Sequence, residues 1–369
     1  MIEATPKSND KEENILFSPL KNEADKFFSL TNLRNDLFYS KDPRKVLEFY
    51  FSFRNVKSII DWLENRPTGR TKIIEVEGDK DCIVIIPTAN HKNDHSQRCK
   101  DKIFKGMHII FVESGNYSDT YFSFSHSCNV GIKKALEYKP TFIVWSNDDM
   151  LKIDEPDRLR DELNGILNNR IKIVFARQRH QVSTPVRVVK FSLVGKFVLG
   201  FIRKTSLYYS IIEHLEDKFN FDHKNRFLDI FYEKILKLSL YCKFQTRFLL
   251  ASTGGSPWSV LFKTVTEYIN FDAFGIFRAN CLNSEEETFD EKLMVQHSDQ
   301  DISLRYALDN HSVSWIDYSI EGIGRATIKD TVDERLRNIL ADIYIDYKIR
   351  NNQYPDLMKI RNLRTFLRE

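Results

Sequence analysis

The stretch TFIVWSNDDM, residues 141–150, places an apolar run directly before three side chains that can coordinate a cation. The residues from Phe142 to Trp145 are β-branched or aromatic, a composition typical of a strand buried on both faces. Ligands of open α/β sheets bind at the carboxyl ends of the strands, so Asn147, Asp148 and Asp149 are expected at a ligand site. The same three residues also suit a turn, because Asn and Asp hydrogen-bond their own backbone.

Short apolar segments alternate with helical patterns on both sides of this strand. The expected strands are KIIEVE (72–77), DCIVIIPTAN (81–90), MHIIFVESGN (107–116) and IKIVFARQR (171–179), and the expected helices are NVGIKKALEY (129–138) and EPDRLRDELNGILNN (155–169). This alternation predicts an α/β fold with a mostly parallel central sheet and helices on both faces.

The remaining sequence divides the chain into five regions. Residues 1–75 are expected to form a flexible tail and a helical prefix, and residues 76–184 to form the first α/β half. Residues 185–255 read as a helical insertion rich in aromatic and basic side chains, without strand-like alternation. Residues 256–328 then form the second half, and residues 329–369 a charged helical tail.

Composition excludes several classes of protein. Of the 369 residues, 42% are hydrophobic, enough to fill a sizeable core. The five cysteines are an odd number without a Cys-x-x-Cys pair, which argues against a disulfide framework or a zinc site. A net charge of +3 indicates no nucleic-acid partner. The first residues contain no apolar leader, so a cytoplasmic location is expected.

Common nucleotide-binding and hydrolase motifs are absent from the sequence. The strand DCIVIIP is followed by TANHKND, without the glycines of a dinucleotide-binding or phosphate-binding loop. No G-x-S-x-G motif supports a serine hydrolase. The remaining possibility is a site that binds a nucleotide without a glycine-rich loop and binds a metal through carboxylates.

A series of motifs resembles the inverting glycosyltransferases of family 2, which have a Rossmann-like GT-A fold. The motifs are IVIIPTAN, IIFVESGN, NVGIKKAL, WSNDDM, GIFRANCL, FDEKL and SDQDISLRY, and they extend from about Asp81 to Ile323. Each is weak alone, but their shared order is specific. The resemblance implies transfer of a sugar from a UDP- or GDP-sugar to a hydroxyl of a glycan or lipid-linked acceptor.

The resemblance implies donor-binding roles for residues of the first half, which becomes the nucleotide-sugar-binding half. These residues are Pro87, Thr88, Ala89 and Asn90 against the base, Glu113 on the base or ribose, and Asn129, Gly131 and Lys133 near the phosphates. Simpler roles stay open for three of them: a turn for Glu113, a helix cap for Asn129 and a solvated charge for Lys133.

The triplet corresponds to the family's Asp-x-Asp motif. Asn147 and Asp149 would hold Mn²⁺ or Mg²⁺, for which oxygen ligands are suited, and Asp148 would face the sugar or ribose. Asparagine in the first position removes one formal charge, so metal dependence is weakened. In the family's histidine position the sequence has Glu321 or Gly322, and the third metal ligand stays unassigned.

The segment HSDQDISLRY corresponds to the family's Glu-Asp-x-Asp-Leu-x-x-Arg, with Ser298 in the glutamate position. Asp299 is therefore expected to be the catalytic base. Asp301 and Arg305 would orient it or contact the acceptor. Alternatively, Asp299 and Asp301 cap a helix. If Asp301 is only a cap, Asp301→Asn should lower stability by roughly 1 kcal/mol or less. His297 is expected to be structural.

The insertion allows two interpretations. Its basic, aromatic helix can lie on an anionic membrane surface or be buried as a helical subdomain, and it lacks an apolar run long enough to span a bilayer. Gly254, Gly255 and Trp258 would form an acceptor wall or a simple connector. A nucleotidyltransferase, or a non-catalytic relative that binds nucleotide sugars, remains an alternative to the glycosyltransferase.

Overall fold

The structure is a computed structural model. It describes residues 31–114, 121–166, 168, 170–178, 183–204, 226–252, 261–282, 288–294, 296–308, 313–323, 331–354 and 357. Gly254, Gly255 and Trp258 lie outside these residues, so their predicted roles stay predictions.

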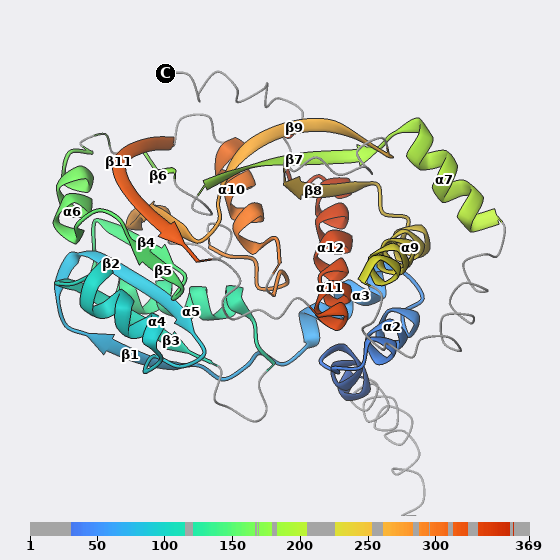
Figure 1. The fold of residues 1–369 in the computed structure, drawn as a ribbon, viewed down its shortest axis with the longest axis horizontal. Helices are drawn as coiled ribbons and strands as arrows, with labels where there is room; N and C mark the ends of the chain where they lie inside the picture. The colour runs from blue at the N-terminus through green and yellow to red at the C-terminus, as the bar shows by residue number, and fades with distance from the viewer. Residues whose placement is uncertain are drawn as a thin grey trace, which may run out of the picture.

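An eight-stranded sheet forms one half of the molecule (Figure 1). Its order is β1-β3-β2-β4-β10-β6-β11-β5, with β1 (Lys72–Val76), β2 (Asp79–Thr88), β3 (Met107–Glu113), β4 (Phe142–Ser146), β5 (Met150–Lys152), β6 (Ile173–Gln178), β10 (Phe274–Arg278) and β11 (Val313–Gly322). The α/β class is confirmed. The sheet is more mixed than predicted, because β1, β5 and β10 run opposite to the other five strands.

Side chains of the central strands fill a core on each face of this sheet. On β2, Val84 and Ile86 contribute to one hydrophobic cluster, whereas Ile83 and Ile85 contribute to the other. This alternation follows from the two-residue period of a strand, and it requires cover on both sides. Helix α5 (Phe124–Leu136) covers one face and α6 (Pro156–Asn164) the other, which confirms the prediction of helices on both faces.

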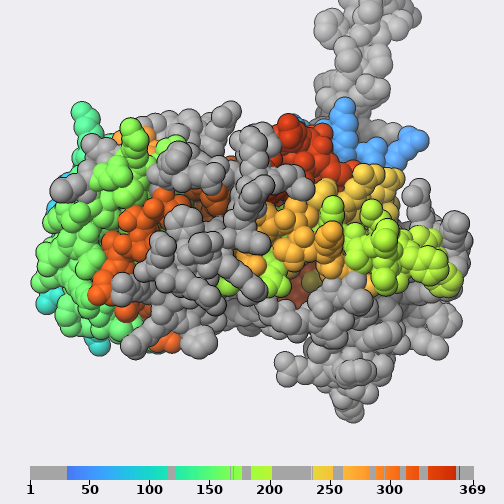
Figure 2. Space-filling model, turned by 90° about the horizontal axis from the view of Figure 1, so that it is seen from above, coloured from blue at the N-terminus to red at the C-terminus, as the bar shows by residue number. Residues whose placement is uncertain are grey.

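A second, three-stranded antiparallel sheet corrects the purely helical interpretation of residues 185–255. Its order is β8-β7-β9, with β7 (Ser183–Phe191), β8 (Phe248–Ser252) and β9 (Phe262–Phe271). Two helices, α7 (Leu193–Lys204) and α9 (Arg226–Phe244), lie between β7 and β8 in the chain. Figure 2 shows β9 and α7, in yellow-orange and yellow-green, on the surface of this half of the molecule.

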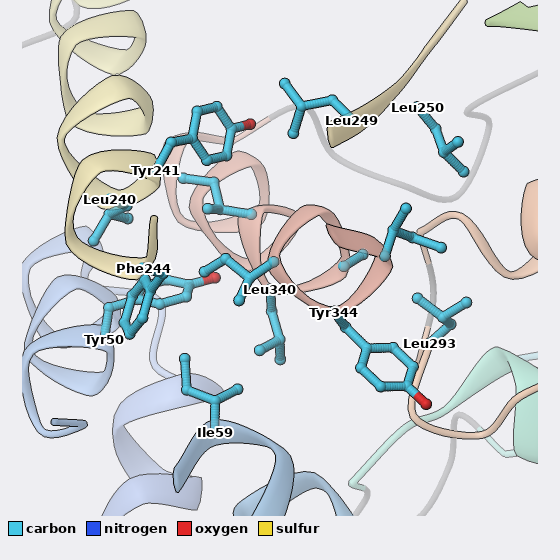
Figure 3. Close-up of a cluster of buried hydrophobic side chains, with 14 of the residues drawn as sticks. Tyr50, Ile59, Leu240, Tyr241, Phe244, Leu249, Leu250, Leu293, Leu340 and Tyr344 are labelled. Carbon is cyan, nitrogen blue, oxygen red and sulfur yellow. The ribbon is translucent and has the colours of Figure 1, made fainter. Parts of the chain in front are cut away.

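The described parts of the N-terminal and C-terminal regions pack together in a helical layer. It contains residues 31–38, α2 (Pro43–Phe51), α3 (Val56–Asn65), α9, α11 (Val332–Arg337) and α12 (Ile339–Arg350). Figure 3 shows α12 at its centre, with Leu340 and Tyr344 among side chains from α2, α3 and α9. Tyr50 on α2 also donates a hydrogen bond of 2.7 Å to the carbonyl of Leu336. The described part of the predicted C-terminal tail is therefore a core element.

Four further elements complete the described chain. They are α4 (Asp94–Arg98), the π-helical turn η1 (Cys99–Ile103), the 3-10 turn η3 (Ala279–Cys281) and α10 (Ser298–Leu308). Helix α10 packs against β9 and places its first turn near the junction of the two sheets. Among the described helices, none is both long and apolar enough to cross a membrane.

Candidate functional site

Several strands of the main sheet end at one edge. Because β2, β3, β4 and β11 run in the same direction, their carboxyl ends meet there (Figure 1). The triplet Asn147-Asp148-Asp149 follows β4 directly, as the sequence predicts. Ile323, after the end of β11, donates its N–H to the carbonyl of Asp149 at 2.9 Å. The triplet thus lies between the ends of β2 and β11.

Asp148 faces inward, toward the loop that follows β2. Its Oδ2 accepts hydrogen bonds from Thr88 Oγ1 at 2.7 Å and from Asn93 Nδ2 at 3.4 Å. Thr88 Oγ1 also lies 3.0 Å from Ser96 Oγ, and Asn93 caps α4. The carboxylate is buried, so these contacts fix the loop against the triplet. Asn93 and Ser96 were not predicted as site residues, because neither is adjacent to Asp148 in sequence.

Glu113 ends β3 and has a partner within the protein. Its Oε2 accepts the backbone N–H of His91 at 3.1 Å and lies 2.5 Å from His91 Nδ1. Asn90, in the same loop, accepts the N–H of Lys92 in a turn, and Ala89 is exposed. Loop 89–93 is thus held from two strand ends at the edge where a ligand would bind.

Asn147 is joined to the turn between β9 and β10. Its backbone N–H donates to the carbonyl of Ala273 at 2.9 Å. Asp149 is buried beside it. The triplet supplies oxygen donors suited to a hard cation, but no three His, Cys, Asp or Glu side chains within the described ranges lie together as a metal site.

Asp299 lies in the first turn of α10, next to the same β9–β10 turn. Its Oδ2 accepts a hydrogen bond from Asn270 Nδ2 at 2.7 Å, and Asn270 Oδ1 accepts one from Ser303 Oγ at 2.9 Å. This second contact fixes the amide, so its N–H faces Asp299. Burial, and next the negative charge of Asp272, raise the pKa of Asp299 to about 7.

Asp272 is a candidate site residue that sequence reasoning missed. It lies between Asn270, which bonds Asp299, and Ala273, which bonds Asn147. The sequence feature that could have identified it is FDAFG, in which an aspartate separates two apolar segments. In the structure these segments are β9, which belongs to the second sheet, and β10, which belongs to the main sheet. Through Asn270 and Ala273, this short segment is hydrogen-bonded both to the predicted base and to the predicted metal-binding triplet.

Asp301 has a structural role. Fully buried, it accepts hydrogen bonds from Lys348 Nζ at 2.5 Å, from Arg305 Nε at 3.0 Å and from the hydroxyl of Tyr354. Burial opposes its ionisation, but the charges of Lys348 and Arg305 outweigh burial and lower its pKa. The predicted pairing of Arg305 with a carboxylate is present within α10. The contacts of Asp301 with Lys348 and Tyr354 anchor α10 to the C-terminal region.

Three predicted phosphate contacts have other positions or partners. Helix α5 begins at Phe124 and is capped by Ser123, so Asn129 lies inside the helix and bonds the backbone of Phe289 through both amide atoms. Gly131 packs on β2, where an added Cβ would lie 2.4 Å from a side-chain carbon of Ile85. Lys133 is exposed in the last turn, away from the strand-end edge.

The other predicted residues contribute little to the site. Pro87 is buried within β2. Glu321 pairs with Leu151, in the ladder between β11 and β5. His297 Nε2 lies 2.9 Å from Asp342 Oδ1, a contact between α12 and the residue just before α10. This contact agrees with the structural role expected for His297.

The chain matches no protein-family model and no curated protein. Its resemblance to family 2 glycosyltransferases therefore rests on the motifs quoted above and remains a prediction.

Proposed function

We propose that the protein is an inverting glycosyltransferase that moves a sugar from a UDP- or GDP-sugar to a hydroxyl group of a glycan or lipid-linked acceptor. The observation that carries this proposal is the position of Asp299. Its carboxylate is oriented by Asn270, has a pKa raised to about 7, and lies next to the β9–β10 turn, which is bonded to Asn147. A carboxylate with this pKa suits a general base near neutral pH.

The reaction proposed is a single displacement. The acceptor oxygen bonds to the anomeric carbon while the bond from that carbon to the diphosphate oxygen breaks with its electron pair. The hydroxyl proton passes to Asp299. Its raised pKa makes it a stronger base than an exposed aspartate, and the hydrogen bond from Asn270 holds one oxygen so that the other can receive the proton.

The strand-end edge would bind the donor. In this proposal the loop after Thr88 packs on the base and Glu113 accepts base or ribose donors, with His91 as its partner in the absence of ligand. Asn147 and Asp149 would hold Mn²⁺ or Mg²⁺. Such an ion stabilises the charge that develops on the leaving diphosphate, whose oxygens would complete its coordination.

Ser298 replaces the family's glutamate, and in this proposal Asp272 takes the place of that missing carboxylate. Asp272 supplies another carboxylate close to Asp299, from the β9–β10 turn rather than from α10. Its charge contributes to the raised pKa of Asp299, so the local electrostatics of a carboxylate pair are kept. We therefore assign the chain to the catalytic relatives rather than to those that only bind.

A thermal-shift screen tests the proposal. Purified protein is heated with UDP- and GDP-sugars, with nucleoside diphosphates and with ATP, each with Mn²⁺ and with a chelator. A ligand that binds the folded state at about 100 times its Kd should add roughly 2.7 kcal/mol to stability. Stabilisation by one class of nucleotide sugar supports the proposal. Stabilisation by ATP or another nucleoside triphosphate alone would favour a nucleotidyltransferase, and donor binding without transfer to any acceptor would indicate a non-catalytic relative.

A further inference from the structure

Helix α7 lies at the periphery of the molecule (Figures 1 and 2), and it exposes large apolar side chains. Leu193 is 85% exposed, Phe197 76%, Phe201 56% and Val194 51%. At about 100° per residue, these four side chains fall within one arc of roughly 100°. Single exposed apolar residues are ordinary, but four on one helix face form a patch of the kind that marks an interaction site.

The opposite side of α7 is fixed to the protein. Ser192 caps the helix, since its Oγ accepts the N–H of Gly195 at 3.1 Å. Gly195 is buried, and an added Cβ there would lie 2.3 Å from the carbonyl oxygen of Leu261. This close packing sets the rotation of the helix, so the apolar arc faces outward as a consequence of the fold.

Basic residues adjoin the apolar arc. The sequence of α7, LVGKFVLGFIRK, contains three basic and no acidic residues. Beneath the helix lies a cavity of about 620 Å³, whose lining includes Lys190, Lys196 and Arg247 and, among the described residues, no Asp or Glu. Its remaining lining is largely apolar, with Phe191, Leu199 and Tyr241. Cations beside an apolar surface match the headgroup and acyl regions of an anionic lipid.

We propose that α7 and this cavity form a docking site for an anionic phospholipid membrane. Leu193, Val194, Phe197 and Phe201 enter the headgroup boundary, and Lys190, Lys196 and Arg247 bind lipid phosphates. Helix α7 has 12 residues, too few to span a bilayer, and lies in the plane of the surface. Contact between two copies of the chain through this face is disfavoured, because it would bring their basic residues together. The proposal does not depend on the proposed transferase activity.

Vesicle co-sedimentation tests the site. The full chain is mixed with phosphatidylcholine vesicles that contain or lack phosphatidylglycerol, at low and high salt. We expect binding to the anionic vesicles that salt weakens. Phe197→Asp with Phe201→Asp should lower it at least about tenfold, because charged groups do not enter the acyl boundary. Lys190→Glu with Lys196→Glu should lower it by about fivefold or more per lysine.

Matched substitutions elsewhere serve as controls. Leu33 is 53% exposed in the N-terminal helical region, and Lys105 is exposed beyond η1. Leu33→Asp and Lys105→Glu should bind vesicles as the unchanged protein does, and circular dichroism checks that all variants fold. Equal binding to neutral and anionic vesicles, or unchanged binding by the double aspartate variant, would overturn the proposal. A dimer that becomes a monomer in that variant would overturn it too, because it would assign the face to a second copy.

Discussion

Replacing Asp301 with asparagine removes the negative charge that holds α10 to the C-terminal region. One carboxylate oxygen accepts from Lys348 and Tyr354, and the other accepts from Arg305. Asparagine offers one acceptor oxygen and places an N–H₂ donor where one carboxylate oxygen was. Either Arg305 or Lys348 must then face another donor inside the protein.

The loss of stability in Asp301→Asn depends on the charge that the substitution leaves buried. Removing one partner of a buried ion pair usually costs about 3–5 kcal/mol, because the other charge stays buried. Lys348 keeps a second contact, to Asp290 Oδ2 at 2.9 Å, so the lower end of this range applies. We expect Asp301→Asn to lower the free energy of unfolding by about 3 kcal/mol. This is several times the cost expected for a helix cap.

The pH dependence has a defined sign. Because the pKa of Asp301 is lowered in the folded state, its contribution is fully present above the unfolded pKa of about 4 and is lost as pH falls through the folded pKa. Urea denaturation followed by circular dichroism should show the full difference from the unchanged protein at pH 7 and a smaller one in acid. Asp317→Asn, at a surface ion pair with Arg158, is the control and should cost less than about 1 kcal/mol. A loss of 1 kcal/mol or less in Asp301→Asn would refute the anchoring role.

Three further predictions follow from the packing and the site. Gly131→Ala, whose Cβ would lie 2.4 Å from a β2 side chain, should lower stability by about 1–3 kcal/mol in urea denaturation, whereas Gly200→Ala, with no atom within 4 Å, should not. The pKa of Asp299 is raised to about 7, so between about pH 4 and 7 only the unfolded state loses the proton; stability falls across this range and the full loss persists above it. Asp299→Asn should therefore be more stable than the unchanged protein at pH 8, by about 4 kcal/mol, and equally stable near pH 4; no gain at pH 8 would contradict the raised pKa. Thr88→Val removes the hydrogen bond to Asp148 and should weaken donor binding several-fold, as measured by calorimetry. An unchanged affinity would show that this contact does not support the donor site.

Local sequence was sufficient for the strands that are buried on both faces. Phe142–Ser146 is apolar up to its last residue, so its end and the position of the triplet could be predicted. The strand Ser183–Phe191 was missed because the pairing shifts between Val188 and Val189, which interrupts the alternation of inward and outward residues. An irregular strand next to an apolar helix has no clear period.

The functions of several polar residues depended on partners distant in sequence. Asp301 bonds Lys348 and Tyr354, which are 47 and 53 residues away, so its segment alone suggested a helix cap. Asn129 bonds Phe289 across 160 residues. The placement of Lys133 near the start of a helix was wrong for a local reason, since α5 begins five residues before Asn129 and ends near the lysine. Tertiary pairing of this kind leaves no periodic pattern in the sequence.

The most direct test of the proposed function compares donor binding with sugar transfer in Asp299→Asn, using a donor found in the thermal-shift screen and an acceptor that it serves. Asparagine keeps the shape of the side chain but cannot accept the acceptor's proton as a carboxylate does. We predict unchanged donor affinity and a transfer rate lower by about 10² to 10⁴. A normal transfer rate in this variant would contradict the assignment of Asp299 as the base, and an equal loss of affinity and rate would place Asp299 in the donor pocket instead.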